Sequence, residues 1–224
     1  MKRAIIFVNG NLSDISQAKK IIKKKDYLIA VDGGTKHILE LGLIPNVIVG
    51  DFDSISSLLL KKLTKICREQ KSLFPTMIKY PTKKNATDFE LVINYCLGKK
   101  FTEIIIFGIL GDRIDHMIAN IFLIAKIQTQ NQSASRRIKI KIFEGKKEIF
   151  ILNKEISING KVGDEISIIP VSEKLEGITT NGLYYRLIDD TFLFGTTRGI
   201  SNVMKQTQIK ISVKKGVALV EHNY

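Results

Sequence analysis

The stretch Asn46-Val47-Ile48-Val49-Gly50-Asp51-Phe52-Asp53-Ser54 decides how the rest of the chain is organised. Its three consecutive β-branched residues predict a short strand that is buried on both faces, and Gly50 marks the point where the chain leaves the sheet. Two carboxylates follow at positions i and i+2, and in an extended backbone this spacing places both on one side, with Phe52 on the other. In an α/β protein, such a strand end is where a ligand binds.

Asp51 and Asp53 repel each other unless a positive group lies between them. Mg²⁺ prefers oxygen ligands, and in nucleotide enzymes it uses one or two carboxylates together with phosphate oxygens. We therefore interpret the pair as a site for a magnesium-bound nucleotide. The alternative is that Asp53 or Ser54 only caps the helix that follows.

The totals describe an ordinary folded protein with an excess of positive charge. At 224 residues the chain is long enough for one large domain or two small ones. The 35 Lys and Arg residues against 22 Asp and Glu residues give a formal charge of +13. Most lysines fall on the polar side of amphipathic patterns, as in residues 19–25, so we interpret them as solvated helix faces whose field attracts anionic substrates.

The expected location is the cytoplasm. The apolar stretch after Met1 is too short for a signal peptide, and no apolar run approaches the roughly 20 residues of a membrane span. Cys67 and Cys96 lie in predicted helices without a partner motif, which indicates buried thiols in a reducing compartment.

Strand and helix patterns alternate up to about residue 132, which predicts a Rossmann-like α/β domain with a mostly parallel sheet covered on both faces. A polar hinge at 129–135 follows. Only short alternating runs come after it, which predict an antiparallel β-barrel or sandwich. We place the domain boundary near residue 135, between domains 1–135 and 136–224. The expected strands of the first domain are 4–8, 27–31, 47–49, 77–80 and 103–107, and its expected helices are 14–25, 35–41, 55–70, 88–97 and 115–128.

Other predicted strands also end in groups that suit an anionic ligand. Asp32-Gly33-Gly34 opens a helix where a backbone can approach a phosphate, although a strand-to-helix turn needs glycines for its geometry as well. In the stretch 82–88, Thr87 is a good N-cap and Asp88 suits the helix dipole, but Asp88 would also face the Asp51 pair, with Lys84 free to meet a phosphate.

The stretch Gly108-Ile109-Leu110-Gly111-Asp112-Arg113-Ile114-Asp115-His116 follows the last of these strands. The guanidinium of Arg113 can bind phosphate oxygens in a fork, whereas Asp115 suits a helix cap and His116 is interpreted as structural. Acids or phosphate-binding groups thus recur at four of the five predicted strand ends, which favours one shared pocket over separate helix caps.

Together these segments resemble the motifs of the thiamine pyrophosphokinase family. The resemblance implies transfer of a diphosphoryl group from ATP to thiamine with Mg²⁺, giving AMP and thiamine diphosphate. It also implies an ATP-binding catalytic domain at 1–135, a thiamine-binding β-barrel domain at 136–224, and a homodimer with the thiamine site between subunits. The segments that carry the resemblance are Asp32-Gly33-Gly34, Gly50-Asp51-Phe52-Asp53-Ser54, Thr87-Asp88, Arg113-Ile114-Asp115-His116 and Arg198-Gly199-Ile200-Ser201-Asn202.

The resemblance also implies roles for single residues. Asp51, Asp53 and Asp88 are expected to hold Mg²⁺, and Asp115 either completes the metal site or accepts the proton of the thiamine hydroxyl. The expected catalytic residues are Asp51, Asp53, Asp88, Arg113 and Asp115, and the expected ligand-binding residues are Asp32, Gly33, Gly34, Lys84, Thr87, Arg113, Ser201 and Asn202.

Two other functions compete with this one. An Asp-x-Asp motif at a strand end also serves other Mg-dependent transferases that use sugar nucleotides or nucleotides. A basic barrel could bind RNA, but Tyr184 and Tyr185 are the only adjacent aromatic pair in the second half of the chain, and stacking on bases needs more. We therefore expect thiamine, ATP and a second copy of the chain as partners, without nucleic acid or membrane.

Overall fold

The computed structural model describes residues 2–111, 113–130 and 138–224. The chain divides into two compact units, one made of Met1–Asn120 and Ile142–Gly145, the other of Ile121–Lys141 and Lys146–Tyr224. The expected boundary near residue 135 and most of the polar hinge fall at 131–137, outside the described residues, as does Asp112. The proposed division at 135 therefore stays a prediction.

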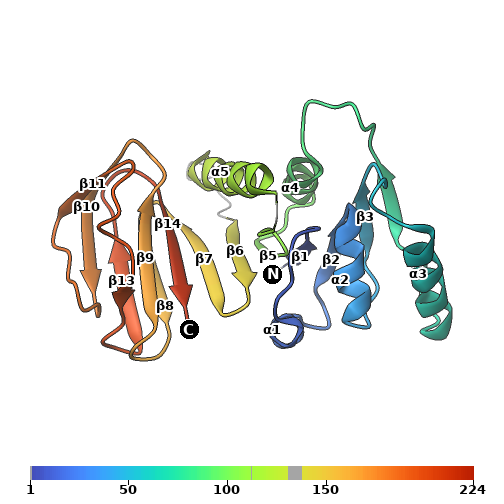
Figure 1. Ribbon diagram of the computed structural model, residues 1–224, viewed down its shortest axis with the longest axis horizontal. Coiled ribbons are helices and arrows are strands. Elements are labelled where there is room, and N and C mark those ends of the chain that lie inside the picture. Colours follow the sequence, from blue (N-terminus) through green and yellow to red (C-terminus); the bar gives the residue numbers. More distant parts are fainter. Residues whose placement is uncertain (1, 112, 131–137) are drawn as a thin grey trace. The chain divides into compact units, whose positions relative to one another are not determined.

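The first unit alternates strands and helices, as expected from the sequence (Figure 1). Its five strands are parallel and lie in the order β5-β1-β2-β3-β4. Its elements are β1 (Arg3–Phe7), α1 (Ile15–Ile21), β2 (Tyr27–Val31), the 3-10 turn η1 (Asp32–Gly34), α2 (Thr35–Glu40), β3 (Val47–Gly50), α3 (Ser57–Glu69), β4 (Thr76–Lys79), α4 (Asp88–Gly98), β5 (Glu103–Phe107) and the first turns of α5 (Ile114–Gln130).

Both faces of this sheet are covered. Alternate residues of the strands, such as Ile5 and Ile48, form one cluster with Ile38 of α2 and Leu63 of α3. On the other face, α4 contacts β2 and β3 and buries Val92 completely. Since successive side chains of a strand point to opposite faces, the continuous apolar runs of β1, β2, β3 and β5 follow directly from this layering.

The second unit contains two antiparallel sheets, which confirms the expected change of class. Strands lie in the orders β12-β9-β14-β7 and β11-β10-β13-β8, and Ile166, Ile178, Ile211 and Val220 are buried between them. Strand β6 (Lys139–Glu144) belongs partly to each unit, and the strands of the second unit are β7 (Lys147–Leu152), β8 (Glu155–Asn159), β9 (Glu165–Pro170), β10 (Lys174–Asn181), β11 (Asp190–Leu193), β12 (Asn202–Val203), β13 (Gln208–Ser212) and β14 (Ala218–Asn223).

Local details differ from the expectations at α1. This helix ends at Ile21 because Ile22 adopts an extended conformation (φ −69°, ψ 132°), and Lys23–Lys25 lie outside it. Cys67 and Cys96 are buried and free, as expected. Within the described part of the chain, every helix is too short or too polar to cross a membrane.

Candidate active site

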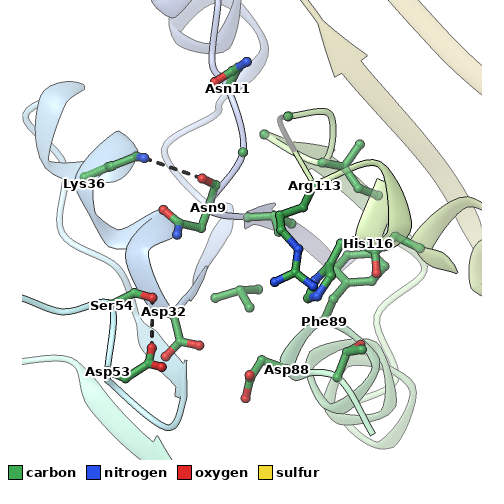
Figure 2. Close-up of a pocket in the computed structure, with 18 of the residues that line it drawn as sticks. Asn9, Asn11, Asp32, Lys36, Asp53, Ser54, Asp88, Phe89, Arg113 and His116 are labelled. Atoms are coloured by element: carbon green, nitrogen blue, oxygen red, sulfur yellow. Dashed lines mark hydrogen bonds between the residues drawn. The ribbon is translucent and has the colours of Figure 1, made fainter. Parts of the chain in front are cut away.

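A cavity of about 490 Å³ opens where β1, β2, β3 and β5 end. The carboxyl ends of parallel strands meet at one edge of the sheet, so segments far apart in sequence line the same space. Figure 2 shows Asp32 and Asp53 on one side of the cavity, with Asp88 and Arg113 on the other. The expected site residues that line it are Asp32, Asp51, Asp53, Thr87, Asp88 and Arg113.

Three of these acids form a tight group. Asp32, Asp51 and Asp53 each offer a carboxylate oxygen, and these oxygens lie within 4.8 Å of one another. Three like charges at this separation favour a cation between them, and an all-oxygen donor set fits a hard divalent ion such as Mg²⁺. The group of acids that could hold a metal therefore includes Asp32, which was expected only among the ligand-binding residues.

Asp32 is held in place by its backbone and by Phe52. It begins η1 with a positive φ of 44°, is 9% exposed, and its Oδ1 accepts a hydrogen bond from the Phe52 amide (3.0 Å). Burial raises the pKa of Asp32 to about 6; the Phe52 N–H opposes this rise, and the charges of Asp88, Asp51 and Asp53 add to it. A cation bound here would favour the ionised form of Asp32.

The turn that carries Asp51 and Asp53 is not extended, which corrects the simple alternation expected from the sequence. Phe52 has a φ of +70°, and its side chain packs against the core cluster that contains Ile38 of α2 and Leu63 of α3. The Asp53 N–H donates to Asp51 Oδ1 (3.2 Å), and Ser54 Oγ donates to Asp53 Oδ1 (2.9 Å). The bond from the Asp53 amide holds the pKa of Asp51 below its usual range, with help from the charge of Lys84.

Asp88 both begins a helix and faces the acids. Thr87 caps α4, since its Oγ1 accepts a hydrogen bond from the Glu90 amide (3.2 Å), so the capping interpretation is correct. Lys84 Nζ lies 2.9 Å from Asp88 Oδ1, and this pairing raises the pKa of Lys84 although burial lowers it. Lys84 is thus already paired with an acid beside the cavity.

Arg113 and Asp115 form a bidentate ion pair at the start of α5. Arg113 Nε and Nη2 donate to the two carboxylate oxygens of Asp115 at 3.0 and 2.6 Å, and both side chains are exposed. The Arg113 guanidinium holds the pKa of Asp115 well below its usual range. Arg113 lines the cavity together with His116, which had been interpreted as structural.

The two glycines after Asp32 serve close packing. A Cβ on Gly34 would overlap the Phe7 carbonyl oxygen, and one on Gly33 would overlap the Asn9 side chain. Each glycine therefore lets η1 approach the end of β1, which matches the geometric alternative for this turn.

Some polar residues of the cavity wall were not predicted from the sequence. Lys36 reaches the carbonyl of Asn9 at 3.5 Å (Figure 2), and Asn120 lies on α5, four residues after His116. A spacing of four places His116 and Asn120 on one helix face, which is a signal that the sequence contains. The missed residues are Lys36, Asn120 and the apolar Phe89, whereas His116 was interpreted as structural.

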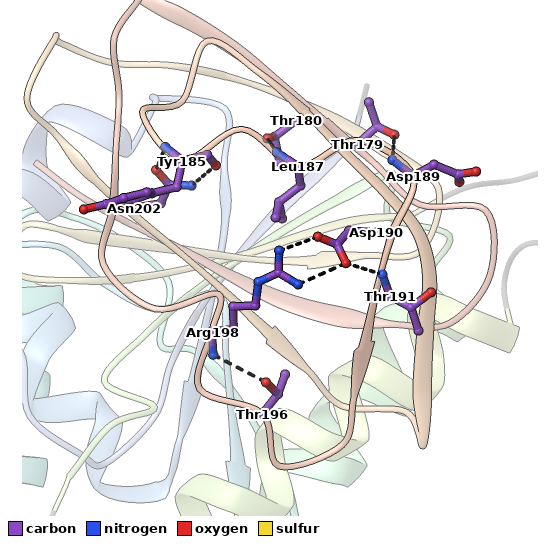
Figure 3. Close-up of polar contacts among 10 residues, drawn as sticks. All are labelled: Thr179, Thr180, Tyr185, Leu187, Asp189, Asp190, Thr191, Thr196, Arg198 and Asn202. Atoms are coloured by element: carbon purple, nitrogen blue, oxygen red, sulfur yellow. Dashed lines mark hydrogen bonds and ion pairs between the residues drawn. The ribbon is translucent and has the colours of Figure 1, made fainter.

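Ser201 and Asn202 belong to the second unit. The Asn202 amide is buried and bonded to the backbone of Tyr185, accepting from its N–H (2.9 Å) and donating to its carbonyl (2.7 Å; Figure 3). Ser201 is exposed and has a φ of +54°. Asn202 therefore fixes a loop, whereas the Ser201 side chain is free to meet a ligand. Near them, Arg198 pairs with Asp190.

Comparisons with known proteins agree with both units. Residues 18–136 match the family "Thiamin pyrophosphokinase, catalytic domain", and residues 153–218 match "Thiamin pyrophosphokinase, vitamin B1 binding domain". Thiamine pyrophosphokinase of Bacillus subtilis (strain 168) is 31% identical over 194 residues, which cover 86% of this chain and 85% of the relative. Thiamin pyrophosphokinase 1 of Caenorhabditis elegans is 26% identical over 219 residues, covering 91% of this chain and 82% of that protein. The crystal structure of the Bacillus subtilis enzyme superposes with a TM-score of 0.82 at 28% identity, covering 99% of each chain.

Proposed function

The chain belongs to the thiamine pyrophosphokinase family, and from this premise we propose that its cavity binds ATP with Mg²⁺ and transfers the terminal diphosphoryl group to thiamine. The observation that carries the proposal is the group of three carboxylates within 4.8 Å in the same cavity as Arg113. This combination of acids and a guanidinium suits a metal-bound polyphosphate.

Asp32, Asp51 and Asp53 are the residues that would hold Mg²⁺. The bound cation would neutralise phosphate oxygens and so reduce repulsion between the nucleotide and these acids. Asp88 lines the same cavity but is paired with Lys84, so we assign it a contact with the metal hydration shell. This proposed ligand set differs from the one that the resemblance implies. Asp32 replaces Asp88 as a direct metal ligand, and Asp88 would contact the metal only through water.

The reaction joins the hydroxyl oxygen of thiamine to the β-phosphorus, releases the hydroxyl proton, and breaks the bond from the β-phosphorus to the α-β bridging oxygen, with AMP as the leaving group. Negative charge grows on that bridging oxygen, and we assign Arg113, which lines the cavity, the role of donating hydrogen bonds there. Asp115 orients the guanidinium of Arg113. Its depressed pKa makes it a weak proton acceptor, which favours this role over that of general base.

We further propose that residues 1–135 bind ATP and residues 136–224 bind thiamine, with Ser201 as a direct contact. The family matches at 18–136 and 153–218 support this division. A homodimer is supported by the large apolar side chains that the second unit leaves exposed, among them Ile188 (66%) and Phe194 (64%). The free thiols of Cys67 and Cys96 support a cytoplasmic location.

Product analysis tests the proposal. The purified protein is incubated with ATP and Mg²⁺, with and without thiamine, and AMP, ADP and thiamine diphosphate are separated. We expect AMP only when thiamine is present. Release of ADP, or of AMP without thiamine, would contradict the proposed transfer.

Asp53→Asn should then lower turnover by about 100-fold or more because one metal-binding charge is lost, while the fold is kept. The matched control is Glu69→Gln, which removes an exposed carboxylate on α3 far from any assigned role. A variant with wild-type turnover at saturating Mg²⁺ would show that Asp53 does not hold the metal.

A further inference from the structure

Asn120 is a buried amide without a hydrogen-bonding partner among the described residues. It is 4% exposed and lines the cavity from α5. Other buried polar side chains are bonded: His37 to the Gly10 carbonyl (2.8 Å), and Asn202 to Tyr185. Because Asn120 lines the cavity and makes no hydrogen bond to the other described residues, its amide is available to pair with a ligand there.

The surroundings of Asn120 differ from those of the acid group. Phe89 and Ile109 line the same cavity and are 3% and 4% exposed, and His116 lies one helical turn before Asn120. An aromatic ring, an aliphatic side chain and a neutral amide suit a flat heteroaromatic ring. A phosphate would instead call for cations or backbone N–H groups.

We propose that Asn120 determines specificity by pairing with a ring edge that carries an amino group beside a ring nitrogen. The amide oxygen would accept from the amino group, and the amide nitrogen would donate to the ring nitrogen. Both the adenine of ATP and the aminopyrimidine of thiamine present this edge. The inference rests on the proposed function, since it assigns a partner within the same site.

Paired analogues with an oxo group in place of the amino group test this assignment, because the oxo group cannot donate and the neighbouring ring nitrogen becomes a donor. Inosine triphosphate carries an oxo group in place of the adenine amino group, and the 4′-oxo analogue of thiamine does the same for the pyrimidine. The kcat/KM ratios ATP:inosine triphosphate and thiamine:oxo-analogue are measured for the wild type and for Asn120→Leu. Asn94→Leu is the matched control, because Asn94 is exposed on α4 and does not line the cavity.

We expect Asn120→Leu to lower one of the two ratios by about 10- to 100-fold, since a lost paired contact removes discrimination between the two ring edges. A fall in the nucleotide ratio identifies adenine as the partner, and a fall in the thiamine ratio identifies the aminopyrimidine. The Asn94→Leu ratios should equal those of the wild type. If both ratios of Asn120→Leu also stay at wild-type values, the inference is wrong.

Two further measurements keep the inference separate from folding and from the proposed function. Because Asn120 makes no hydrogen bond to the described residues, its replacement by leucine leaves none of them unpaired. The melting temperature of Asn120→Leu should therefore stay at or above that of the wild type. If leucine does not fit, the same kcat/KM ratios are measured for Asn120→Ala. A lowered melting temperature with unchanged ratios would indicate a structural role instead. Failure of the wild type to form AMP from ATP and thiamine would overturn the proposed function, whereas an active wild type with unchanged variant ratios would overturn only the role of Asn120.

Discussion

Replacing Gly50 by alanine tests whether the turn after β3 holds Asp32 in the acid group. A Cβ at this position would overlap the carboxylate of Asp32, and the φ of Gly50 is +155°. Asp32 would have to swing away and release the hydrogen bond from the Phe52 amide (3.0 Å). The loss of a hydrogen bond to a carboxylate and added backbone strain together lower the free energy of unfolding by about 3 kcal/mol.

For a chain of this length, that loss corresponds to a decrease of about 6–12 °C in the melting temperature. We expect AMP formation at saturating Mg²⁺ to fall as well, because Asp32 leaves the metal-binding group. Thermal unfolding followed by circular dichroism and the thiamine-dependent AMP assay measure the two effects on the same sample.

Two glycines provide matched controls for this variant. Gly42 has a φ of +74° and nothing within 4 Å of an added Cβ, so Gly42→Ala reports backbone strain without a clash. Gly98 also has free space and ends α4, so Gly98→Ala should be neutral or slightly stabilising. A Gly50→Ala protein with the melting temperature and turnover of the wild type would refute the reasoning, and so would a Gly42→Ala protein that loses as much stability and activity.

Three other perturbations follow from the same contacts. Arg113→Lys should reduce kcat by about 10- to 100-fold, because an ammonium cannot form the paired contact that a guanidinium makes; rates within twofold of the wild type would contradict its assigned role. Ser201→Ala should raise the thiamine KM more than the ATP KM, and equal changes in both would remove Ser201 from the thiamine site. Burial raises the pKa of Asp164, but hydrogen bonds with the Lys161 amide and His222 outweigh it and hold this pKa below its usual value. The ionised Asp164 therefore stabilises the folded protein above about pH 4, and this contribution is lost as the pH falls through the folded-state pKa. Asp164→Asn should therefore be less stable than the wild type at pH 7, and the difference should shrink as the pH falls below about 4, as measured by urea unfolding; a difference that does not shrink with falling pH would contradict the assignment.

Much of the fold follows from local patterns in the sequence. The bounds of β2 and β5 match the expected strands at 27–31 and 103–107, because apolar runs of this length between polar segments have few other ways to be buried. The N-cap at Thr87 was also readable, since the side chain acts on an amide three residues away. The change to antiparallel strands in the second half follows from the period of two in runs such as 208–212.

The composition of the acid group depends on the order of the strands. Asp32 follows β2 and Asp51 follows β3, and these two strands are neighbours in register, with Val31 opposite Val49. No local pattern in the sequence shows that β2 and β3 are neighbours. Nor does it show that any side chain larger than that of Gly50 would overlap the Asp32 carboxylate. The sequence therefore identified acids at strand ends, but only the packed sheet could decide that Asp32 joins Asp51 and Asp53.

The position of Asn120 required the tertiary structure for the same reason. Helical spacing places it on one face with His116, but whether that face meets solvent, core or cavity depends on how α5 packs. By itself the sequence determined which segments become strands and helices and which residue types end them, because these depend on neighbours a few positions away. Tertiary structure alone decided which side chains share a space, because that depends on contacts between segments tens of residues apart.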